Sequence, residues 1–368
     1  MLVNKEERRD GLMKRRFMLG MLLPMLALLI AACTLNPSGK LSSDSSELTV
    51  YFIDVGQAHS TLFVSDGVAM LVDGGNPSDS SLIYTFLRDR GITHLDYIVA
   101  THAHEDHVGG LAGALNYATA GVAFSPVTSF DSRAFNSFVR YLDVQGVSIT
   151  VPTHGDTFQL GGADVLVLSP IRESSNHNNM SIVMKITHGD VSFIITGDAE
   201  REAEQDILDA GYDISATVLL VGHHGSETST TYPFLREVMP QYAVISCGRN
   251  NQYGHPHENT LSRLRDADVI LYRTDMQGDI TAVSDGKTVT FTVERNAGIQ
   301  TNPTAHEDAQ PPPTVQADND EGYIGNMNSL VFHSTSCSNL PADQNQIYFD
   351  TRDKAVGAGK RPCGNCNP

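Results

Sequence analysis

The 368-residue sequence contains no tryptophan, so any aromatic platform in it uses phenylalanine or tyrosine. Its five cysteines are too few to hold a chain of this length together by disulfides. Basic residues are also scarce, 25 against 43 acidic ones, and the formal net charge is −18. This charge argues against a protein that wraps nucleic acid by bulk positive charge. It does not exclude a metal site that acts on phosphates, because metal ions supply local positive charge.

The N-terminal region lacks an apolar run long enough for a good membrane span. Residues 17–32 carry no charge but include Pro24, and a transmembrane helix needs about 20 apolar residues. A basic stretch precedes this run, and Ala31-Ala32-Cys33 ends it. This order is typical of a secretory signal and resembles a bacterial lipobox. We therefore predict a lipoprotein signal peptide and lipobox over residues 1–33, lipidation at Cys33, and an extracytoplasmic protein that is lipid-anchored to the bacterial cell membrane. The alternative is an uncleaved membrane anchor, which also leaves the rest of the chain outside the cytoplasm.

Composition divides the remaining chain into four segments. Residues 34–47 contain Ser, Pro and Gly and predict a tether, and the Pro-rich residues 296–321 predict a linker. Residues 48–295 alternate strand-like and helical patterns, and residues 322–368 form a small C-terminal unit. Glycine-containing turns predict hairpins around residues 66–67, 161–162 and 189–190, and helices are predicted over residues 78–90, 106–117, 132–145 and 199–210.

A run of histidines and acidic residues directly after a strand-like segment carries the strongest chemical signal. His102 and His104 are two residues apart and point the same way in extended backbone. Asp106 and His107 lie where the chain turns into a helix, and they can face a second ion. Imidazole and carboxylate are ligands that zinc and manganese accept, and two ions about 3.5–4 Å apart can share one bridging hydroxide. The alternative interpretation is a solvated polar loop.

This string resembles the H-x-H-x-D-H signature of the metallo-β-lactamase fold. The resemblance implies an α/β protein built as a four-layered αββα sandwich, with ligands on loops at one edge of the two sheets. It also implies later ligands: Asp198 as a bridging aspartate, and a histidine from the doublet His223-His224. His224, next to a glycine, is the better candidate, but the doublet leaves the choice open. For Asp198 the alternative is a helix N-cap.

Many members of this family place another histidine ligand between the first motif and the bridging aspartate. The matching region here contains His177, followed by Asn178 and Asn179. His177 is one candidate for this ligand. In the other interpretation His177 is a loop histidine, and Asn178 or Asn179 occupies the position. Without His177, one ion is held more weakly and metal occupancy depends on conditions.

Further strings look like the metallo-β-lactamase domain of ComEC-type DNA-uptake channel proteins and their soluble relatives, over roughly residues 48–293. The strings include Asp54-Val55-Gly56-Gln57, Asp73-Gly74-Gly75, Thr196-Gly197-Asp198, His223-His224-Gly225-Ser226 and Tyr253-Gly254-His255-Pro256. What this resemblance implies is hydrolysis of a phosphodiester, with DNA as the expected substrate.

Several residues beyond the histidine ligands receive candidate roles from this chemistry. Asp73, Asp106 and His255 make up the candidate catalytic set. Asp73 orients a ligand histidine or, alternatively, caps a turn. His255 protonates the leaving oxygen or contacts phosphate, unless it is a plain loop histidine. Ser226 and Asn179 are candidate substrate contacts, and a helix cap is the simpler interpretation of Ser226.

Three of the five cysteines lie near the C-terminus. His333 and Cys337 form one pair and Cys363 and Cys366 a second, a spacing that suits a closed tetrahedral zinc site. A disulfide interpretation leaves one cysteine over. The segment resembles the metal-binding domain of the Ada DNA-repair protein, but His333 stands where that family has its first cysteine, so methyl-accepting chemistry is not expected. A structural zinc would supply folding energy to so small a unit.

These features predict an extracytoplasmic metal-dependent hydrolase, a phosphodiesterase or nuclease acting on DNA through a dinuclear metal-bound hydroxide. The expected cofactors are two divalent ions, zinc or manganese, in the hydrolase site and one structural zinc in the C-terminal module. DNA is the expected substrate, the membrane is contacted through the lipid anchor, and no protein partner is predicted. The alternatives are a metallo-hydrolase on another ester (a phosphocholine ester, lactone or thioester) and a non-catalytic DNA-capture lipoprotein.

Overall fold

The computed structural model describes residues 47–303 and 322–368, except residues 365 and 367. The predicted signal peptide with Cys33, the tether up to residue 46 and most of the predicted linker lie outside these residues. Within the described ranges, no helix is both long enough and apolar enough to cross a membrane.

The first sheet contains eight strands, in the order β15 (Val289–Val293), β14 (Ile280–Ser284), β1 (Leu48–Phe52), β2 (Thr61–Ser65), β3 (Val68–Val72), β4 (His94–Val99), β5 (Thr119–Phe124) and β6 (Ile149–Thr150). Strands β1, β2 and β3 pair antiparallel, whereas β3 to β6 run parallel. Alternate residues of β1 are fully buried, as expected for a strand with one face in a core. The predicted hairpin around residues 66–67 is the β2–β3 connection.

The second sheet contains seven strands, in the order β13 (Ile270–Arg273), β12 (Tyr242–Ile245), β11 (Val218–Leu220), β10 (Val191–Ile195), β9 (Val183–His188), β8 (Ala163–Ser169) and β7 (Thr157–Leu160). Strands β10 to β13 are parallel, and β7 to β10 are antiparallel. The other two predicted hairpins are the β7–β8 and β9–β10 connections.

The two sheets pack face to face over a buried apolar core. Phe63 of β2 and Phe193 of β10 meet edge to face across it, with ring centroids 6.3 Å apart. Burial of such side chains stabilises the sandwich by about 25 cal/mol for each Å² of apolar surface removed from water. The sandwich is therefore a rigid support for the loops that leave its edges.

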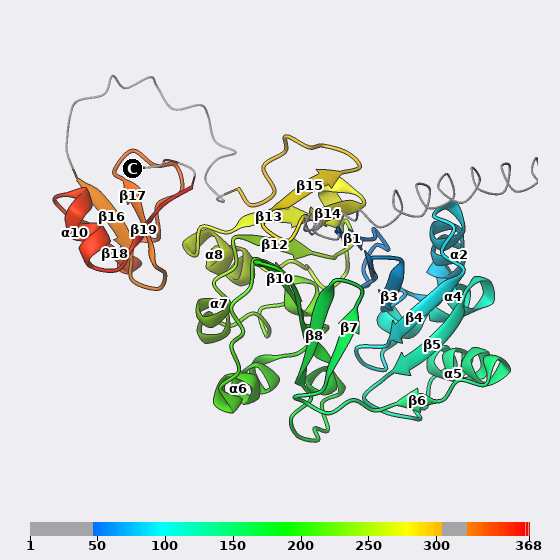
Figure 1. Cartoon of the computed structure of the whole chain (residues 1–368). Helices are drawn as coiled ribbons and strands as arrows, with labels where there is room; N and C mark the ends of the chain where they lie inside the picture. Colours follow the sequence, from blue (N-terminus) through cyan, green and yellow to red (C-terminus); the bar gives the residue numbers. More distant parts are fainter. Residues whose placement is uncertain (1–46, 304–321, 365, 367) are drawn as a thin grey trace, which may run out of the picture. The chain divides into compact units, whose positions relative to one another are not determined.

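Helices cover the outer face of each sheet (Figure 1). Helices α2 (Ser80–Asp89), α4 (Leu111–Tyr117) and α5 (Arg133–Gln145) share one buried cluster with the first sheet. Helices α6 (Arg201–Ala210), α7 (Tyr232–Val238) and α8 (Glu258–Asp266) share another with the second sheet. The four layers are those of the αββα sandwich, so the predicted fold class is confirmed. The short elements are α3 (Glu105–Val108), α9 (Thr274–Gln277) and the 3₁₀ helices η1 (Pro77–Asp79), η2 (His177–Met180) and η3 (Gly222–Gly225).

The single helix predicted over residues 106–117 is wrong, because the chain breaks there into α3 and α4 at Gly109 and Gly110. A Cβ on Gly109 would lie 2.2 Å from the backbone nitrogen of Pro77, and one on Gly110 would lie 1.9 Å from the carbonyl oxygen of Gly74. The two glycines let the loop after β3 press against this break. That contact brings the loop after β3 beside α3.

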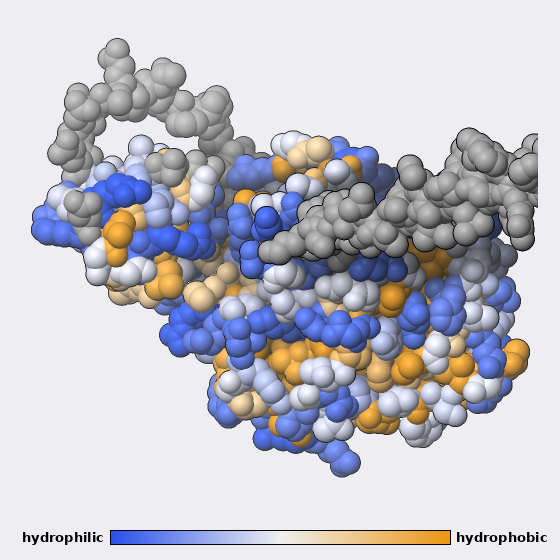
Figure 2. Space-filling model, in the orientation of Figure 1, coloured by the Kyte–Doolittle hydropathy of each residue, from blue (hydrophilic) through white to orange (hydrophobic). Residues whose placement is uncertain are grey.

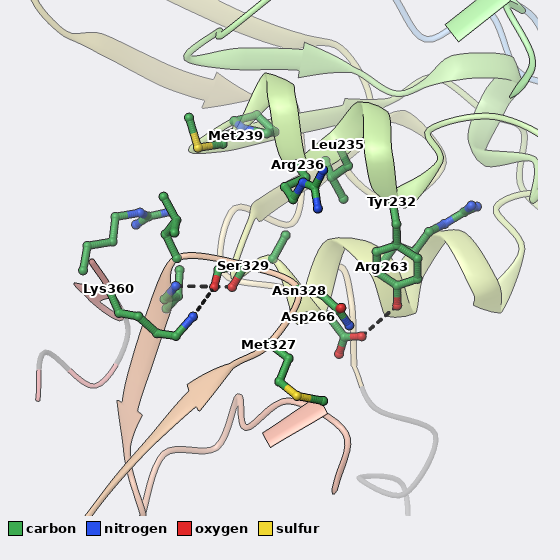
Figure 3. A pocket seen from close by; sticks show the side chains of 15 residues that line it. Tyr232, Leu235, Arg236, Met239, Arg263, Asp266, Met327, Asn328, Ser329 and Lys360 are labelled. Carbon is green, nitrogen blue, oxygen red and sulfur yellow. Dashed lines mark hydrogen bonds between the residues drawn. The ribbon is translucent and has the colours of Figure 1, made fainter. Parts of the chain in front are cut away.

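The C-terminal module has its own four-stranded sheet, in the order β18 (Gln346–Phe349), β16 (Tyr323–Asn326), β17 (Val331–Ser334) and β19 (Arg361–Pro362). It also contains η4 (Asp343–Asn345) and α10 (Arg352–Gly357). The Lys360 ammonium group donates a hydrogen bond to the carbonyl oxygen of Ser329 at 2.7 Å (Figure 3). It also donates to the carbonyl oxygen of Asn326 at 2.8 Å, and so ties the β16–β17 turn to the start of β19. The buried apolar side chains of the module include Ile324, Phe332 and Ala355, and Val331 clusters with two cysteines.

Residues 296–303, which composition assigns to the linker, hold specific bonds to the sandwich. The Thr301 hydroxyl donates to the carbonyl of Leu271 at 2.5 Å, and the Asn302 amide donates to the carbonyl of Leu261 at 3.0 Å.

Figure 2 shows hydrophilic and hydrophobic residues interspersed on the visible surface.

Candidate metal centre

Five loops converge where parallel strands of both sheets end. They follow β3, β4, β10, β11 and β12, and they carry Asp73, the His102–His107 string, Asp198, the histidine doublet and Ser246. Parallel strands release their carboxyl ends at the same sheet edge, so residues far apart in sequence meet there. The sheet topology thus assembles the site from single residues on separate loops.

The first pair of histidines follows β4. The His102 Nε2 atom lies 2.9 Å from His104 Nδ1, and it also lies 3.8 Å from Asp198 Oδ2. The hydroxyl of Thr101 lies 3.3 Å from His102 Nδ1 and can accept its hydrogen, which leaves Nε2 as the acceptor. Burial lowers the pKa of His102 to about 3, so its ring is neutral at pH 7 and suited to a metal.

A second group gathers four ligand atoms within 4.8 Å of one another, from Asp106, His107, Asp198 and His224. The His107 Nε2 atom lies 3.2 Å from Asp198 Oδ1, and the His224 Nε2 atom lies 3.3 Å from Asp106 Oδ2 and 3.7 Å from Asp198 Oδ1. The two oxygens of Asp198 therefore face different histidines: Oδ1 faces His107 and His224, whereas Oδ2 faces His102. This is the geometry that a bridging carboxylate requires.

The Asp198 backbone is held so that its carboxylate points inward. Helix α6 begins with Glu200 as its N-cap residue, so Asp198 is not used as the cap. The Asp198 N–H donates to the Ser181 hydroxyl at 3.0 Å. Gly197 has φ +51°, and a Cβ there would lie 2.9 Å from the side chain of Thr101. The turn Thr196-Gly197-Asp198 therefore packs closely against the loop that carries His102 and His104.

The buried carboxylate of Asp73 makes several hydrogen bonds to residues of the centre. Its Oδ2 atom lies 2.7 Å from His107 Nδ1 and 2.7 Å from His59 Nδ1, and it accepts from the Thr101 hydroxyl at 2.7 Å. Burial opposes ionisation, but His107 and His59 outweigh it and hold the pKa of Asp73 well below its usual value. A charged Asp73 fixes the His107 proton on Nδ1 and turns Nε2 toward Asp198.

The side chains present fit divalent metal ions. Two buried ring nitrogens, His107 Nε2 and His224 Nε2, make no hydrogen bond. Buried polar atoms are normally satisfied, so two such nitrogens beside two carboxylates fit the role of metal ligands. The donor set of imidazole nitrogens and carboxylate oxygens suits zinc or manganese.

The doublet His223-His224 lies in η3 with an unusual backbone. Both residues are left-handed, with φ values of 51° and 56°. For residues with a Cβ this conformation costs about 1–3 kcal/mol each and is concentrated at functional sites. The His224 Nδ1 atom lies 2.9 Å from the carbonyl oxygen of Ser246, and the His223 Nδ1 atom lies 3.3 Å from Glu200 Oε1.

His177, Asn179 and Ser226 are not part of the group formed by Asp106, His107, Asp198 and His224. The exposed His177 ring packs edge-on against Phe130, with centroids 5.0 Å apart, and against His104 at 6.0 Å. The Asn179 side chain is buried and accepts from the backbone N–H of Glu200 at 3.0 Å. The Ser226 hydroxyl is buried and lies 3.0 Å from the Thr228 hydroxyl.

His255 stands at the rim of the centre. Its ring lies nearly parallel to that of His224, with centroids 6.2 Å apart, and nearly parallel to that of Tyr253 at 5.6 Å. Burial, with a smaller contribution from neighbouring histidines, lowers the pKa of His255 to about 4. The side-chain oxygen Oε1 of Gln57 accepts from the Gly248 N–H at 3.0 Å, so the side-chain nitrogen Nε2 faces His255 Nδ1 at 3.3 Å. His255 therefore carries its hydrogen on Nε2.

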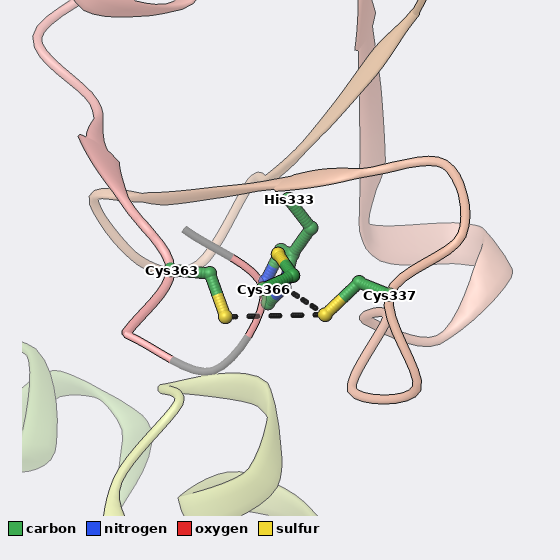
Figure 4. Close-up of side chains that lie close together, drawn as sticks. All are labelled: His333, Cys337, Cys363 and Cys366. Carbon is green, nitrogen blue, oxygen red and sulfur yellow. Dashed lines mark hydrogen bonds between the residues drawn. The ribbon is translucent and has the colours of Figure 1, made fainter. Parts of the chain in front are cut away.

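The C-terminal module brings His333, Cys337, Cys363 and Cys366 together (Figure 4). The parallel pairing of β17 with β19 places His333 and Cys363 side by side. The His333 Nδ1 atom lies 3.3 Å from Cys337 Sγ, and Cys337 Sγ lies 3.9 Å from Cys363 Sγ. A tetrahedral site with Zn–S bonds of about 2.3 Å separates its sulfurs by a similar distance. The cluster can therefore hold one metal ion.

Comparison with known families agrees with this fold. The model of the metallo-beta-lactamase superfamily matches residues 53–249, more than half of the sequence, and the chain belongs to that superfamily. It is 33% identical over 269 residues to ComE operon protein 3 of Bacillus subtilis (strain 168), which covers 68% of this chain and 34% of that protein. It is 28% identical over 258 residues to Competence protein ComA of Neisseria gonorrhoeae, with 69% and 35% covered.

A third relative is Recombination protein 2 of Haemophilus influenzae, 31% identical over 235 residues, with 62% of this chain and 28% of that protein covered. The chain thus spans about a third of the length of the curated relatives it matches. These matches confirm the ComEC-type resemblance: the chain is a metallo-β-lactamase-superfamily hydrolase related to competence proteins.

Three residues of the centre were not singled out as site residues from the sequence. His59 and Thr101 both bind Asp73, and Glu200 binds His223. The only sequence signals are the short string that contains His59, the threonine before His102, and an acidic residue two positions after Asp198. None of these is distinctive until the fold brings the loops together.

Proposed function

We propose that the protein is an extracytoplasmic phosphodiesterase or nuclease that hydrolyses DNA with two divalent ions, zinc or manganese. The observation that carries the proposal is the bridging position of Asp198, whose two oxygens face different sets of histidines. One set includes His102 and His104, and the other includes His107 and His224 together with Asp106. Ions held there supply Lewis acidity for the hydrolysis of a phosphodiester.

His255 is suited to contact the substrate phosphate. At pH 7 its ring is neutral, because its pKa is lowered to about 4 mainly by burial. Its Nε2–H is the donor, because Gln57 donates to Nδ1. Of the two roles expected for His255, donation of a hydrogen bond to a phosphate oxygen therefore fits better than proton transfer to the leaving oxygen.

Two exposed residues beside His255 favour a nucleic acid over a smaller ester. Tyr253 is 58% exposed and its ring continues the stack of His255. Arg249 is exposed in the same loop. A stacking ring and a cation are what a strand of DNA needs beside a phosphate-cleaving site. The names of the relatives, which refer to competence and recombination, point to DNA as well.

The proposal extends to the two ends of the chain. The N-terminal sequence supports a signal peptide, lipidation of Cys33 and attachment to the membrane from outside the cytoplasm. In the C-terminal module, His333 and the three nearby thiols would hold one structural zinc, which would stabilise a unit with a small apolar core.

Cleavage of DNA by the purified full chain tests the proposal. Single- and double-stranded oligonucleotides are incubated with manganese or zinc, beside the D198N variant. We expect metal-dependent cleavage that D198N lowers by at least about 100-fold while its melting temperature stays close to that of the wild type. Absence of cleavage with both ions bound, combined with turnover of a phosphocholine ester, lactone or thioester, would contradict a DNA substrate. DNA binding by a protein that hydrolyses none of these would favour the capture lipoprotein instead.

A further inference from the structure

We propose that both histidines of the doublet are metal ligands, one for each ion, and that Glu200 is the positioning residue for His223. The inference rests on the proposed two-ion function and deepens it. It assigns to His223 the additional histidine-ligand role for which His177 was one candidate in the sequence. The ion on the Oδ2 side of Asp198 would then be held by His102, His104, Asp198 and His223.

The geometry of the doublet carries this assignment. The His223 Nε2 atom lies 3.6 Å from Asp198 Oδ2, and the His224 Nε2 atom lies 3.7 Å from Asp198 Oδ1. Side chains of successive residues in extended backbone point to opposite faces, so two adjacent histidines would not normally face one carboxylate. The consecutive left-handed residues of η3 remove that restriction and turn both rings toward Asp198. A strained backbone that serves both rings is unexplained if only one of them binds metal.

Each ring also has an oxygen atom beside its Nδ1 nitrogen, which orients the ring as in a metal ligand. The carbonyl of Ser246 accepts from His224 Nδ1 at 2.9 Å, and Glu200 Oε1 lies 3.3 Å from His223 Nδ1. In both cases the proton is held on Nδ1, and Nε2 is left to bind the ion. Histidines that bind metals almost always donate their other nitrogen to a carbonyl or carboxylate in this way.

Glu200 is itself fixed by three further side chains. Its carboxylate accepts from the Asn176 amide at 2.9 Å, from the Asn178 amide at 3.1 Å and from the Thr228 hydroxyl at 3.2 Å. The asparagines of η2 therefore hold the carboxylate that orients His223. This gives the Asn-His-Asn-Asn segment a role in the centre without requiring His177 as a ligand.

Manganese titration of the full chain, followed by electron paramagnetic resonance, tests the assignment without measuring activity. Manganese prefers oxygen and nitrogen ligands, so the Cys-rich cluster contributes little to the signal. The variants are H223A, H224A and H177A, with thermal unfolding to check the fold. We expect the wild type and H177A to give the spectrum of a coupled manganese pair. We expect H223A and H224A each to give the spectrum of an isolated ion.

The positioning role of Glu200 is tested with E200Q, and E202Q is the matched control. Glu202 lies on the same helix and binds the Asn179 amide rather than a histidine. We expect E200Q to weaken the binding of one manganese ion by about 10- to 100-fold and E202Q to leave both ions unaffected. A coupled pair in H223A that is lost in H177A would overturn the assignment, as would equal effects of the two glutamate variants. An intact pair without DNA cleavage would instead overturn the proposed substrate and leave the assignment standing.

Discussion

The two clusters of metal-ligating side chains rest on supports of very different size. In the hydrolase domain the ligands come from loops between residues 102 and 224, on two packed sheets with three large buried clusters. In the C-terminal module the four proposed ligands lie between residues 333 and 366, and the buried apolar residues around them are few, among them Val331 and Phe332. We therefore expect a bound metal to serve chemistry in the hydrolase domain and to stabilise the fold in the C-terminal module.

Removal of metal is therefore expected to affect the two regions differently. The sandwich buries enough apolar surface to hold its fold, so its metal centre can be emptied while the loops stay in place. The module is far below the size at which a single core supplies stability, so its metal would be part of its fold.

The largest effect is expected from C363S, which removes one thiol of the module. Cys363 is fully buried beside Cys337, so the substitution removes a ligand and part of the small core at once. We expect amide hydrogens of residues 322–368 to exchange as in an unfolded chain, while those of the sandwich strands keep their protection. The measurement is hydrogen exchange of the full chain by mass spectrometry. Retained protection in the module would contradict a structural metal.

A smaller effect is expected from D73N in the hydrolase domain. The amide that replaces the Asp73 carboxylate has one oxygen and no charge, so it cannot accept from the two histidines at Oδ2 and also from the Thr101 N–H at Oδ1, and it holds His107 less firmly. We expect the affinity for manganese to fall by about 10- to 100-fold while the fold is retained. Calorimetric titration measures this, with D96N as a control because Asp96 binds only the backbone of Ala69 and lies near His94. Unchanged affinity in D73N would show that Asp73 is only a turn residue.

Binding of metal should also release protons. Burial opposes the charged form of His107, but Asp198, Asp73 and Asp106 outweigh it and raise the pKa of His107 well above its usual value. The metal-free ring is therefore protonated at pH 7, and an ion must displace that proton, whereas His102 is already neutral. We expect the heat of manganese binding at pH 7 to depend on the ionisation enthalpy of the buffer, and the dependence to decrease as the pH rises through the raised pKa of His107. A heat independent of the buffer at pH 7 would contradict this charge state.

The smallest effect is expected from Tyr253. Its exposed ring continues the stack of His255 and touches no ligand histidine in the described contacts. Stacking of a base on an aromatic ring is worth about 1–3 kcal/mol, so Y253A should weaken binding of single-stranded DNA by about tenfold and Y253F should not. Fluorescence anisotropy with a normal and an abasic oligonucleotide measures this. Equal loss for both oligonucleotides would rule out base stacking.

The parts of the fold that depend on local patterns could be predicted from the sequence. The turn at residues 66–67 sits between two strand-like runs and forms the β2–β3 hairpin. The helix predicted over residues 132–145 is α5, where Ser132 caps the first turn and Gly146 ends the helix in a left-handed conformation. The His102–His107 string could be recognised because all its members are close in sequence.

The parts that depend on distant contacts could not be predicted. The break at Gly109 and Gly110 exists because the loop after β3 approaches them, and no local pattern reports that approach. Glu200 rather than Asp198 begins α6, because Ser181 from another loop holds the Asp198 backbone. The roles proposed for the two histidines of the doublet likewise rest on contacts with Glu200 and Ser246, which come from other loops.

The most direct test of the central claim is a crystal structure of the full chain grown with manganese and measured at the manganese absorption edge. The account predicts two anomalous peaks about 3.5–4 Å apart, one beside each oxygen of Asp198, with His223 at the first and His224 at the second. A single peak, or a peak ligated by His177 in place of His223, would contradict it.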